Sequence, residues 1–471
     1  MNKENPLRKL QEEMTALREG KANKTLLQEE SIEQIEKQNS QHGKITKVYG
    51  PPGTGKTTFL INAVRDALQS GVSPHEIGYF SFTNKATEEA KTRMAAEFPS
   101  FSIEEDFPGF RTLHSLAFQA LPNRTKIMTG DEALAFDSGF FIETQYMKEN
   151  DPTSLVYRAK HIVVDAAATA RARLIDFEVY LRGASESERY RLNRWLGYPA
   201  RQCKKEFSDL DIQRQLAYNA KYEAYKNSIN AIDYTSILEE AINNPSGIPG
   251  YELLIIDEAQ DLSLLQWKLA SLVIDRSNKV LIAGDDDQAI CESFGASANA
   301  FLSMDGHEHA LTQSHRVPSK IHAAIFSPNG IISTLSRRYV RKEKQWKAKD
   351  NADGSFQHLL KIDPLLAMLD KNRDDWLIMA ATHSSLMTLS NILKERKIAH
   401  FLSNQLIDST EINTEYPTIR LMTIWGAKGG EAKNAVLLRG PYADEIMLDD
   451  DPRLVYVAIT RAKENFYVCP I

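Results

Sequence analysis

The stretch "KVYGPPGTGKTTFLINAV", from Lys47 to Val64, contains the pattern G-x-x-x-x-G-K-T between a short apolar run and a helical run. Gly53 and Gly55 allow the backbone to curl so tightly that successive N–H groups point at one anion. The helix that opens near Lys56 adds the positive end of its dipole. The stretch therefore predicts a phosphate-binding loop that joins a strand to a helix.

Individual residues of this loop have expected roles. Lys56 should reach the β- and γ-phosphates of a nucleotide, and the Thr57 hydroxyl should bind Mg²⁺. A glycine-rich turn without a ligand is the alternative, but the full pattern with its flanking strand and helix disfavours it. The loop alone names no function, because many unrelated proteins use it. The predicted nucleotide-binding residues are Gly50, Pro51, Pro52, Gly53, Thr54, Gly55, Lys56, Thr57 and Thr58.

Length and composition set the broad class of protein. With 471 residues, 42% of them hydrophobic and 25% charged, the chain is expected to be globular and to form two or more domains. No apolar run approaches the ~20 residues of a membrane span, and the N-terminus lacks an apolar signal core. Cys203, Cys291 and Cys469 show no paired spacing, which argues against a zinc site or a disulfide framework. These features predict a cytoplasmic protein.

The charge is unevenly distributed along the chain. The net charge is −6, yet residues 158–226 and the run "RRYVRKEKQWKAK", Arg337 to Lys349, are basic. Such runs are most often solvated faces. On an acidic protein, two such runs, one of which holds Trp346, are also typical of a nucleic-acid-binding surface.

Apolar strand candidates alternate with amphipathic helices over most of the chain. "ITKVY", "IGYFSF", "ELLIID" and "KVLIAG" are strand-like, as are "WLIMA", "TIRLMTI", "NAVLLR" and "NFYVC" further along. This alternation predicts an α/β fold with two parallel-sheet domains. A mostly helical, basic stretch interrupts the first of them. The expected boundaries are 1–120 and 227–304 for the first domain, 121–226 for the helical insertion and 305–471 for the second domain.

Two further strands end in polar groups. In "LLIIDEAQDLS", the apolar strand delivers Asp257 and Glu258 to its carboxyl edge, the usual ligand crevice of an open sheet. Asp257 is suited to hold Mg²⁺ and Glu258 to deprotonate an attacking water. In "VLIAGDDDQAI", Gln288 can sense a γ-phosphate by hydrogen bonding. The alternatives are a solvated acidic pair at a strand end and an acidic turn with Gln288 as a bystander.

Together these motifs resemble those of a superfamily 1 helicase of the UvrD/Rep type. "GPPGTGKT" resembles motif I, "FSFTNKATEEAKTRM" motif Ia, "RTLHSLAFQAL" motif Ib and "IIDEAQD" motif II. "GDDDQAI" resembles motif III, "LTQSHR" motif IV, "IRLMTIWGAKGGE" motif V and "LVYVAITRAK" motif VI. They occur in the family's order from residue 50 to residue 463. The resemblance implies two RecA-like domains of the P-loop NTPase class. Only about 107 residues lie from Arg316 of motif IV to Thr423 of motif V, so the 2B domain of larger relatives should be much reduced, around 335–415.

The resemblance also implies roles at the nucleotide. Arg316 and Arg461 match the family's two arginine fingers, which stabilise charge on the γ-phosphate. Glu431 resembles the residue that holds the ribose, and His315 stands where a tyrosine usually stacks on adenine. Gln34 lies near the position of the adenine-reading glutamine, although Ser31-x-x-Gln34 is also a helix capping box. The implied catalytic residues are Lys56, Glu258, Gln288, Arg316 and Arg461.

Contacts to DNA are implied in the same way. Phe82 is either a base-stacking ring or a core aromatic, and the usual aromatic after motif III is replaced by Ser293 with Phe294 next to it. Trp425 stands where the family has histidine. It is either a grip on a base, which the neighbouring glycines favour, or part of the core. The implied DNA-binding residues are Phe82, Thr83, Asn84, Lys85, His114, Phe294, Thr423 and Trp425.

The sequence thus predicts an ATP-dependent DNA helicase that moves 3′-to-5′ on single-stranded DNA, the polarity resting on the resemblance. ATP and Mg²⁺ are the expected cofactors. Single-stranded DNA and duplex junctions are the expected partners, with replication or repair proteins in addition and no membrane. A monomer is expected. A nucleotide-switched DNA-binding or loading ATPase that does not translocate is the main alternative, and an RNA helicase is a further one.

Overall fold

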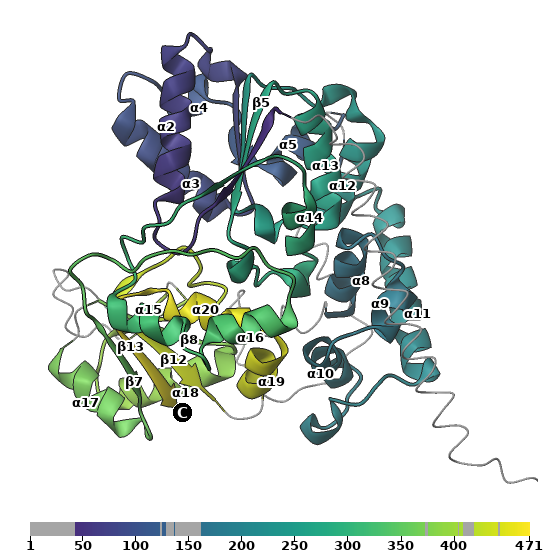
Figure 1. Cartoon of the computed structure of the whole chain (residues 1–471). Coiled ribbons are helices and arrows are strands. Elements are labelled where there is room, and N and C mark those ends of the chain that lie inside the picture. The colour runs from purple at the N-terminus through teal and green to yellow at the C-terminus, as the bar shows by residue number, and fades with distance from the viewer. Residues whose placement is uncertain are drawn as a thin grey trace, which may run out of the picture.

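Two parallel β-sheets, each covered by helices on both faces, form the body of the chain (Figure 1). The computed structural model describes residues 43–122, 125–128, 136, 162–372, 375–403, 405–407, 419–440 and 443–471. The predicted α/β class with two sheets is confirmed, and all eight strand segments read from the sequence lie in these sheets.

The first sheet is entirely parallel, and its inner strands are the apolar runs of the sequence. Its order is β3 (Phe110–Thr112), β2 (Ile77–Ser81), β4 (Leu253–Asp257), β5 (Lys279–Gly284), β1 (Ile45–Tyr49) and β6 (His307–Ala310). One face is covered by α2 (Lys56–Gln69), α3 (Asn84–Glu97) and α4 (Ile103–Asp106). The other face is covered by α5 (Leu113–Ala120), α12 (Tyr234–Asn243), α13 (Leu264–Asp275) and α14 (Ala298–Ser303).

Strand β6 shifts one predicted domain boundary. Its residues pair in parallel with β1, with Thr46 opposite His307 and Tyr49 opposite Ala310. The expected end of the first domain at residue 304 is therefore wrong, because the sheet continues through Ala310. The sequence "HEHA" gave no strand signal, since all four residues of this edge strand are exposed and none of them needs to be strongly apolar.

A group of helices stands beside the first sheet, within the range expected for the insertion and just beyond it. It comprises α8 (Ile162–Ala172), α9 (Phe177–Arg182), α10 (Glu186–Trp195) and α11 (Asp209–Ser228), and it has a small core of its own. Helix α10 reaches α19 (Ala443–Asp450) of the second domain (Figure 1). There the Ser187 hydroxyl donates to the Asp450 carboxylate at 2.6 Å. The insertion therefore touches both sheet domains.

The second sheet has the order β10 (Gln405–Ile407), β9 (His400–Leu402), β11 (Ile419–Thr423), β8 (Trp376–Ala380), β12 (Ala432–Arg439), β13 (Ala462–Pro470) and β7 (Ser355–His358). Only the β9–β10 pair is antiparallel among these described strands. One face carries α15 (Ser319–Ile325), α16 (Ile331–Arg338), α19 (Ala443–Asp450) and α20 (Arg453–Ile459). The other carries α17 (Asp363–Lys371) and α18 (His383–Glu395).

Most of the region expected to be a reduced 2B domain belongs to this second sheet. Within 335–415, the described strands β7, β8, β9 and β10 pair into the sheet, and α17 and α18 pack on it. The expectation of a remnant domain there is wrong for these residues. Strand β7, "SFQH", is polar and lies at an edge of the sheet, and strand β9, "HFL", is short. Neither gave a strand signal in the sequence, so the continuous second sheet could not be predicted there.

Three side chains of the basic run 337–349 are packed against other parts of the chain and are not open to solvent. Trp346 is 5% exposed and packs edge-on against His322 and Phe326, at ring centroid distances of 4.6 and 5.5 Å. Arg341 and Lys344 are paired with buried acids of motif III. The hypothesis that this run binds nucleic acid is therefore wrong for these three side chains, because they are part of the folded interior.

Candidate functional site

The predicted phosphate-binding loop lies between β1 and α2, where a segment of the second domain packs onto it. Gly53 and Gly55 adopt left-handed backbone with φ of 72° and 80°. The His315 amide donates to the Gly53 carbonyl at 2.8 Å, and the Ser314 hydroxyl to the Pro52 carbonyl at 2.8 Å. A Cβ on Gly53 would stand 2.4 Å from the Arg316 Cβ, so only glycine lets motif IV approach this closely.

Helix α2 opens at this loop without a side-chain cap. Gly55 is its N-cap and provides no side-chain acceptor, whereas α3 and α5 are capped by the hydroxyls of Thr83 and Thr112. An uncapped first turn leaves backbone N–H groups available to an anion, and the helix dipole favours a negative charge there. This geometry fits a phosphate group. Thr57, on the same turn, is half-buried, and Thr58 is exposed.

Lys56 lies against the two acids at the end of β4. Its ammonium is 2.6 Å from a Glu258 carboxylate oxygen and 3.2 Å from an Asp257 oxygen. Burial alone would lower the pKa of Lys56, but the two carboxylates outweigh it and raise the pKa above its ordinary value. For Glu258, burial acts to raise the pKa, but Lys56 and Lys428 together lower it to about 2. Glu258 is therefore ionised and held by cations.

Both acids are fixed by hydrogen bonds that the sequence did not indicate. The Tyr79 hydroxyl donates to Asp257 at 2.8 Å. The Gln260 amide donates to the second Glu258 oxygen at 2.6 Å, and its own carbonyl accepts from the Asp285 amide at 2.9 Å. Gln260 thus links Glu258 of motif II to the beginning of motif III through two hydrogen bonds. The sequence "DEAQD" contained this glutamine, but only the fold shows what it contacts.

Gln288 and Arg461 meet across the two domains. An Arg461 Nη donates to the Gln288 side-chain carbonyl at 2.8 Å, and the Gln288 amide donates to Asp285 at 2.7 Å. Arg461 is 1% exposed, and burial, with the nearby Arg316, lowers its pKa to about 9. The structure therefore brings the two predicted residues of motifs III and VI into direct contact.

Arg316 and Glu431 lie on the second-domain side of the same site. The Arg316 Nε donates to one Glu431 oxygen at 2.7 Å, and the Lys463 ammonium approaches the other at 3.1 Å. Burial acts to raise the pKa of Glu431, but these two cations lower it. His315 is exposed beside the phosphate loop, whereas Gln34 lies outside the described residues. Glu431 is thus an anchor for an arginine as well as a candidate ribose ligand.

Lys428 is a further site residue that sequence reasoning missed. Its ammonium pairs with Asp261 of motif II and donates to the Gln288 backbone carbonyl at 2.8 Å. Lys428 comes from motif V of the second domain, so it fastens that domain to both acidic motifs of the first. The quoted motif "GAKGGE" contains Lys428, but the contacts that Lys428 makes across the domain interface could not be predicted from the motif.

Thr57 and Asp257 were the predicted Mg²⁺ ligands, and their surroundings fit a hydrated cation. Both lie next to Lys56, one on the uncapped first turn of α2 and the other as a buried carboxylate at the end of β4. Among the described residues, no cluster of three or more His, Cys, Asp or Glu side chains could hold a metal by protein ligands alone. Mg²⁺ bound with a nucleotide keeps several waters and phosphate oxygens, so two protein groups suffice. It would supply positive charge to the phosphates.

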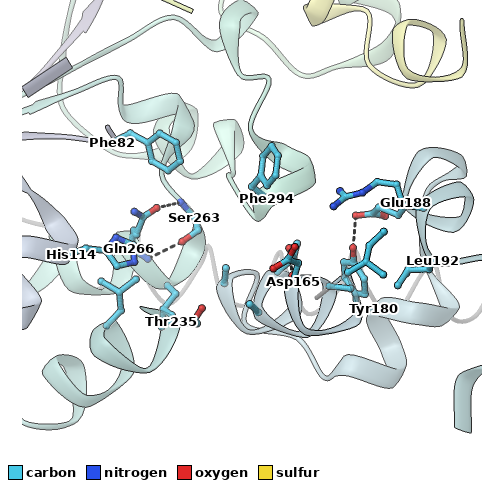
Figure 2. Close-up of a pocket in the computed structure, with 18 residues that line it drawn as sticks. Phe82, His114, Asp165, Tyr180, Glu188, Leu192, Thr235, Ser263, Gln266 and Phe294 are labelled. Carbon is cyan, nitrogen blue, oxygen red and sulfur yellow. Dashed lines mark hydrogen bonds between the residues drawn. The ribbon is translucent and has the colours of Figure 1, made fainter. Parts of the chain in front are cut away.

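A second candidate site is a pocket of about 350 Å³ between the first domain and the helical insertion (Figure 2). Phe82, His114 and Phe294 line it from the first domain, and Phe294 is 53% exposed. Asp165 and Glu188 line it from the insertion. The structure therefore brings together three of the predicted DNA contacts, which are separated widely in the sequence.

Thr83, Asn84, Thr423 and Trp425, whose side chains the structure describes, are not among the residues that line this pocket. Thr83 caps α3 by accepting from the Ala86 amide at 3.1 Å, and Asn84 is exposed at the beginning of that helix. Thr423 accepts from the Gly426 amide at 3.2 Å. The side chains of Lys85 and Ser293 lie outside the described part of the chain.

Trp425 is half-buried and packs against the core of the second domain. Its indole N–H donates to the Ile290 carbonyl at 2.9 Å, so it joins motif V to the loop after motif III. These contacts are those of a packed interface residue. They favour the core alternative over the grip on a base.

The fold is of the α/β class, and the candidate nucleotide site is built from both sheet domains. Residues 30–309 match the family described as "UvrD/REP helicase N-terminal domain". The chain therefore belongs to the UvrD/REP helicase family, a class of ATP-hydrolysing DNA helicases of superfamily 1.

Several curated relatives are similar to the chain at low identity. A "Probable DNA helicase" of Mycoplasma pneumoniae is 23% identical, with 91% of this chain and 80% of that protein covered. A "DNA helicase II" of Rickettsia typhi is 24% identical, covering 54% of this chain and 36% of its own length. The "ATP-dependent DNA helicase PcrA" of Staphylococcus aureus is 23% identical, with 70% of this chain and 43% of that protein covered. The chain thus spans less than half the length of the latter two relatives. No helix within the described residues has the length and apolar character needed to cross a membrane.

Proposed function

We propose that the chain is a translocase that couples ATP hydrolysis between its two RecA-like domains to 3′-to-5′ movement on single-stranded DNA and to strand separation. The contact between Gln288 of the first domain and Arg461 of the second carries this proposal. An arginine that reaches the γ-phosphate sensor from the other domain makes hydrolysis depend on how the domains are apposed. Arg316, packed on Gly53, supplies the second guanidinium.

The pairing of Lys56 with Glu258 supports a specific order of events in hydrolysis. A Glu258 carboxylate with a pKa of about 2 is a poor base, because its ion pairs stabilise the ionised form. Nucleotide phosphates attract Lys56 and draw it away from Glu258. The loss of that ion pair raises the pKa of Glu258 and makes it a competent base for the attacking water. Binding of the nucleotide therefore switches on the base that hydrolyses it.

The pocket lined by Phe82, His114 and Phe294 is the proposed path of single-stranded DNA. Aromatic rings stack on bases without reading sequence, as a translocating enzyme requires. Phe82 also packs against the cores of both sheet domains, so a base bound there is sensitive to their relative position. We infer a first domain formed by 43–120 and 229–310, an insertion at 121–228 that includes all of α11, and a second domain from 311 onward. The proposed active form is a monomer that uses ATP with Mg²⁺.

A nucleotide-switched DNA-binding ATPase without translocation is the second candidate. The contacts of Lys428 and Trp425 across the interface favour it, because they fasten the domains to each other and oppose large repeated motion. A strand-displacement assay with 3′- and 5′-tailed duplexes, with and without ATP, separates the two. Displacement on the 3′-tailed duplex that requires ATP supports the translocase. ATP-dependent binding without displacement on either duplex supports the switch.

A further inference from the structure

A cluster of buried charges is formed by the acids of motif III and a lysine of the second domain. Asp285, Asp286 and Asp287 follow β5, and all three are buried. The Lys344 ammonium lies 2.6, 2.5 and 3.0 Å from their carboxylates, and the Lys344 side chain is 2% exposed. Lys344 belongs to the extended segment between α16 and β7 of the second domain. One cation from the second domain thus holds three acids of the first.

Lys344 and Gln288 are bound to the two oxygens of the same carboxylate. Lys344 donates to Oδ1 of Asp285 at 2.6 Å, and the Gln288 amide donates to Oδ2 at 2.7 Å. The Gln288 carbonyl then accepts from Arg461. We propose that Lys344 is a positioning residue for ATP hydrolysis, which orients Gln288 towards Arg461 through Asp285. This inference rests on the proposed function, in that it assumes a role for Gln288 in turnover.

A simpler role for Lys344 would be to neutralise buried acids. Three adjacent carboxylates out of water are costly without a cation, so its loss should destabilise the fold whatever its role in turnover. The neighbouring Arg341 distinguishes the two roles. It binds Asp287 through two hydrogen bonds of 2.8 and 2.7 Å, and Asp287 has no hydrogen bond to Gln288 among those found. Arg341 therefore neutralises the same cluster without touching the carboxylate that orients Gln288.

The test compares Lys344→Met with Arg341→Met in the full chain. ATP turnover is measured at saturating single-stranded DNA, well below each variant's melting temperature. Lys344→Met should lower kcat about tenfold or more and change KM for ATP by less than about threefold, as loss of an interaction used in the chemical step does. Arg341→Met should keep kcat within about threefold of the parent chain at a comparable loss of stability. Equal losses of kcat in the two variants would overturn the proposal.

A double-mutant cycle with Gln288→Ala tests the path of the effect. If Lys344 acts through Gln288, adding Lys344→Met to Gln288→Ala should cost little further kcat, whereas independent effects would multiply. Full multiplication overturns the proposal. Should Gln288→Ala itself keep the parent turnover, the proposed role of Gln288 fails instead, and the two failures are thus distinguished.

A charge-balanced variant covers the case in which Lys344→Met does not fold. Lys344→Met/Asp286→Asn removes one positive and one negative charge, so the net charge of the cluster stays as in the parent chain. Its kcat should remain low, because Asp285 still lacks its partner. Recovery of parent kcat in this variant would show that Lys344 only neutralises charge, and would overturn the positioning role.

Discussion

The ammonium of Lys56 lies 2.6 Å from the carboxylate of Glu258, so the proposed base is engaged by the residue expected to bind phosphate. We expect Glu258→Gln to keep ATP binding and nearly abolish hydrolysis, since it removes the base and leaves Asp257 and Thr57 intact. Nucleotide affinity and DNA-stimulated turnover check this. Glu252→Gln, at the opposite end of β4, is the control. Turnover within a few-fold of the parent chain would show that Glu258 is not the base.

Arg461→Ala should lower DNA-stimulated ATP turnover by about 10³-fold, because it removes a guanidinium that stabilises transition-state charge. The variant should still bind single-stranded DNA, since Arg461 is buried away from the aromatic pocket. Arg439, exposed at the end of β12, provides the matched control as Arg439→Ala. A turnover rate that is equal with and without DNA in the parent chain would contradict the coupling on which this expectation depends.

Trp425→Ala should destabilise the chain by about 3–5 kcal/mol, the usual cost of truncating a packed aromatic side chain. The reason is its packing on the second core and its hydrogen bond to the Ile290 carbonyl. Chemical denaturation and single-strand affinity are the measurements. Trp425→Phe, which keeps an aromatic ring but loses the N–H and part of the volume, should show an intermediate effect. A stable Trp425→Ala chain whose DNA binding is weakened by about 1–3 kcal/mol would instead identify a grip on a base.

His114 should make the stability of the chain depend on pH in a defined window. Burial lowers its pKa to about 4, below the ordinary value of 6.5. The neutral form of this half-buried histidine is therefore compatible with the fold at full stability above pH 6.5, and this contribution is lost as the pH falls towards 4. The melting temperature of the parent chain should drop more between pH 7 and pH 5 than that of His114→Gln. Parallel pH profiles for the two chains would refute the assignment.

The sheets could be predicted where strands are buried. The runs at β4, β5 and β8 are nearly continuous apolar segments because both faces of these strands are covered, and such runs are distinctive. The strand β6 could not be predicted in this way. It lies at an edge of its sheet, where exposed polar residues such as those of "HEHA" are compatible with a strand. Only its pairing with β1 identifies it.

The site shows the same division between local and long-range information. Lys56 and Glu258 stand in short motifs whose residue types follow directly from phosphate and water chemistry. Gln260 and Lys428 stand in the quoted motifs too, but their roles depend on which side chain the fold places within reach. Lys344 was seen only as one charge in a basic run. Its partners lie 57 to 59 residues away in the sequence, so no local pattern could reveal them.

The burial of Lys344 among three acids has a consequence for how the chain denatures. Two sheets with separate cores would ordinarily melt as two independent units. Here, unfolding of the second domain alone would break the ion pairs of Lys344 and Arg341 and leave Asp285, Asp286 and Asp287 side by side without a cation. Because adjacent like charges repel and the lost ion pairs no longer stabilise the first domain, the half-melted chain is disfavoured. Calorimetry should therefore record a single cooperative transition, which separates into two when Lys344 is replaced by methionine.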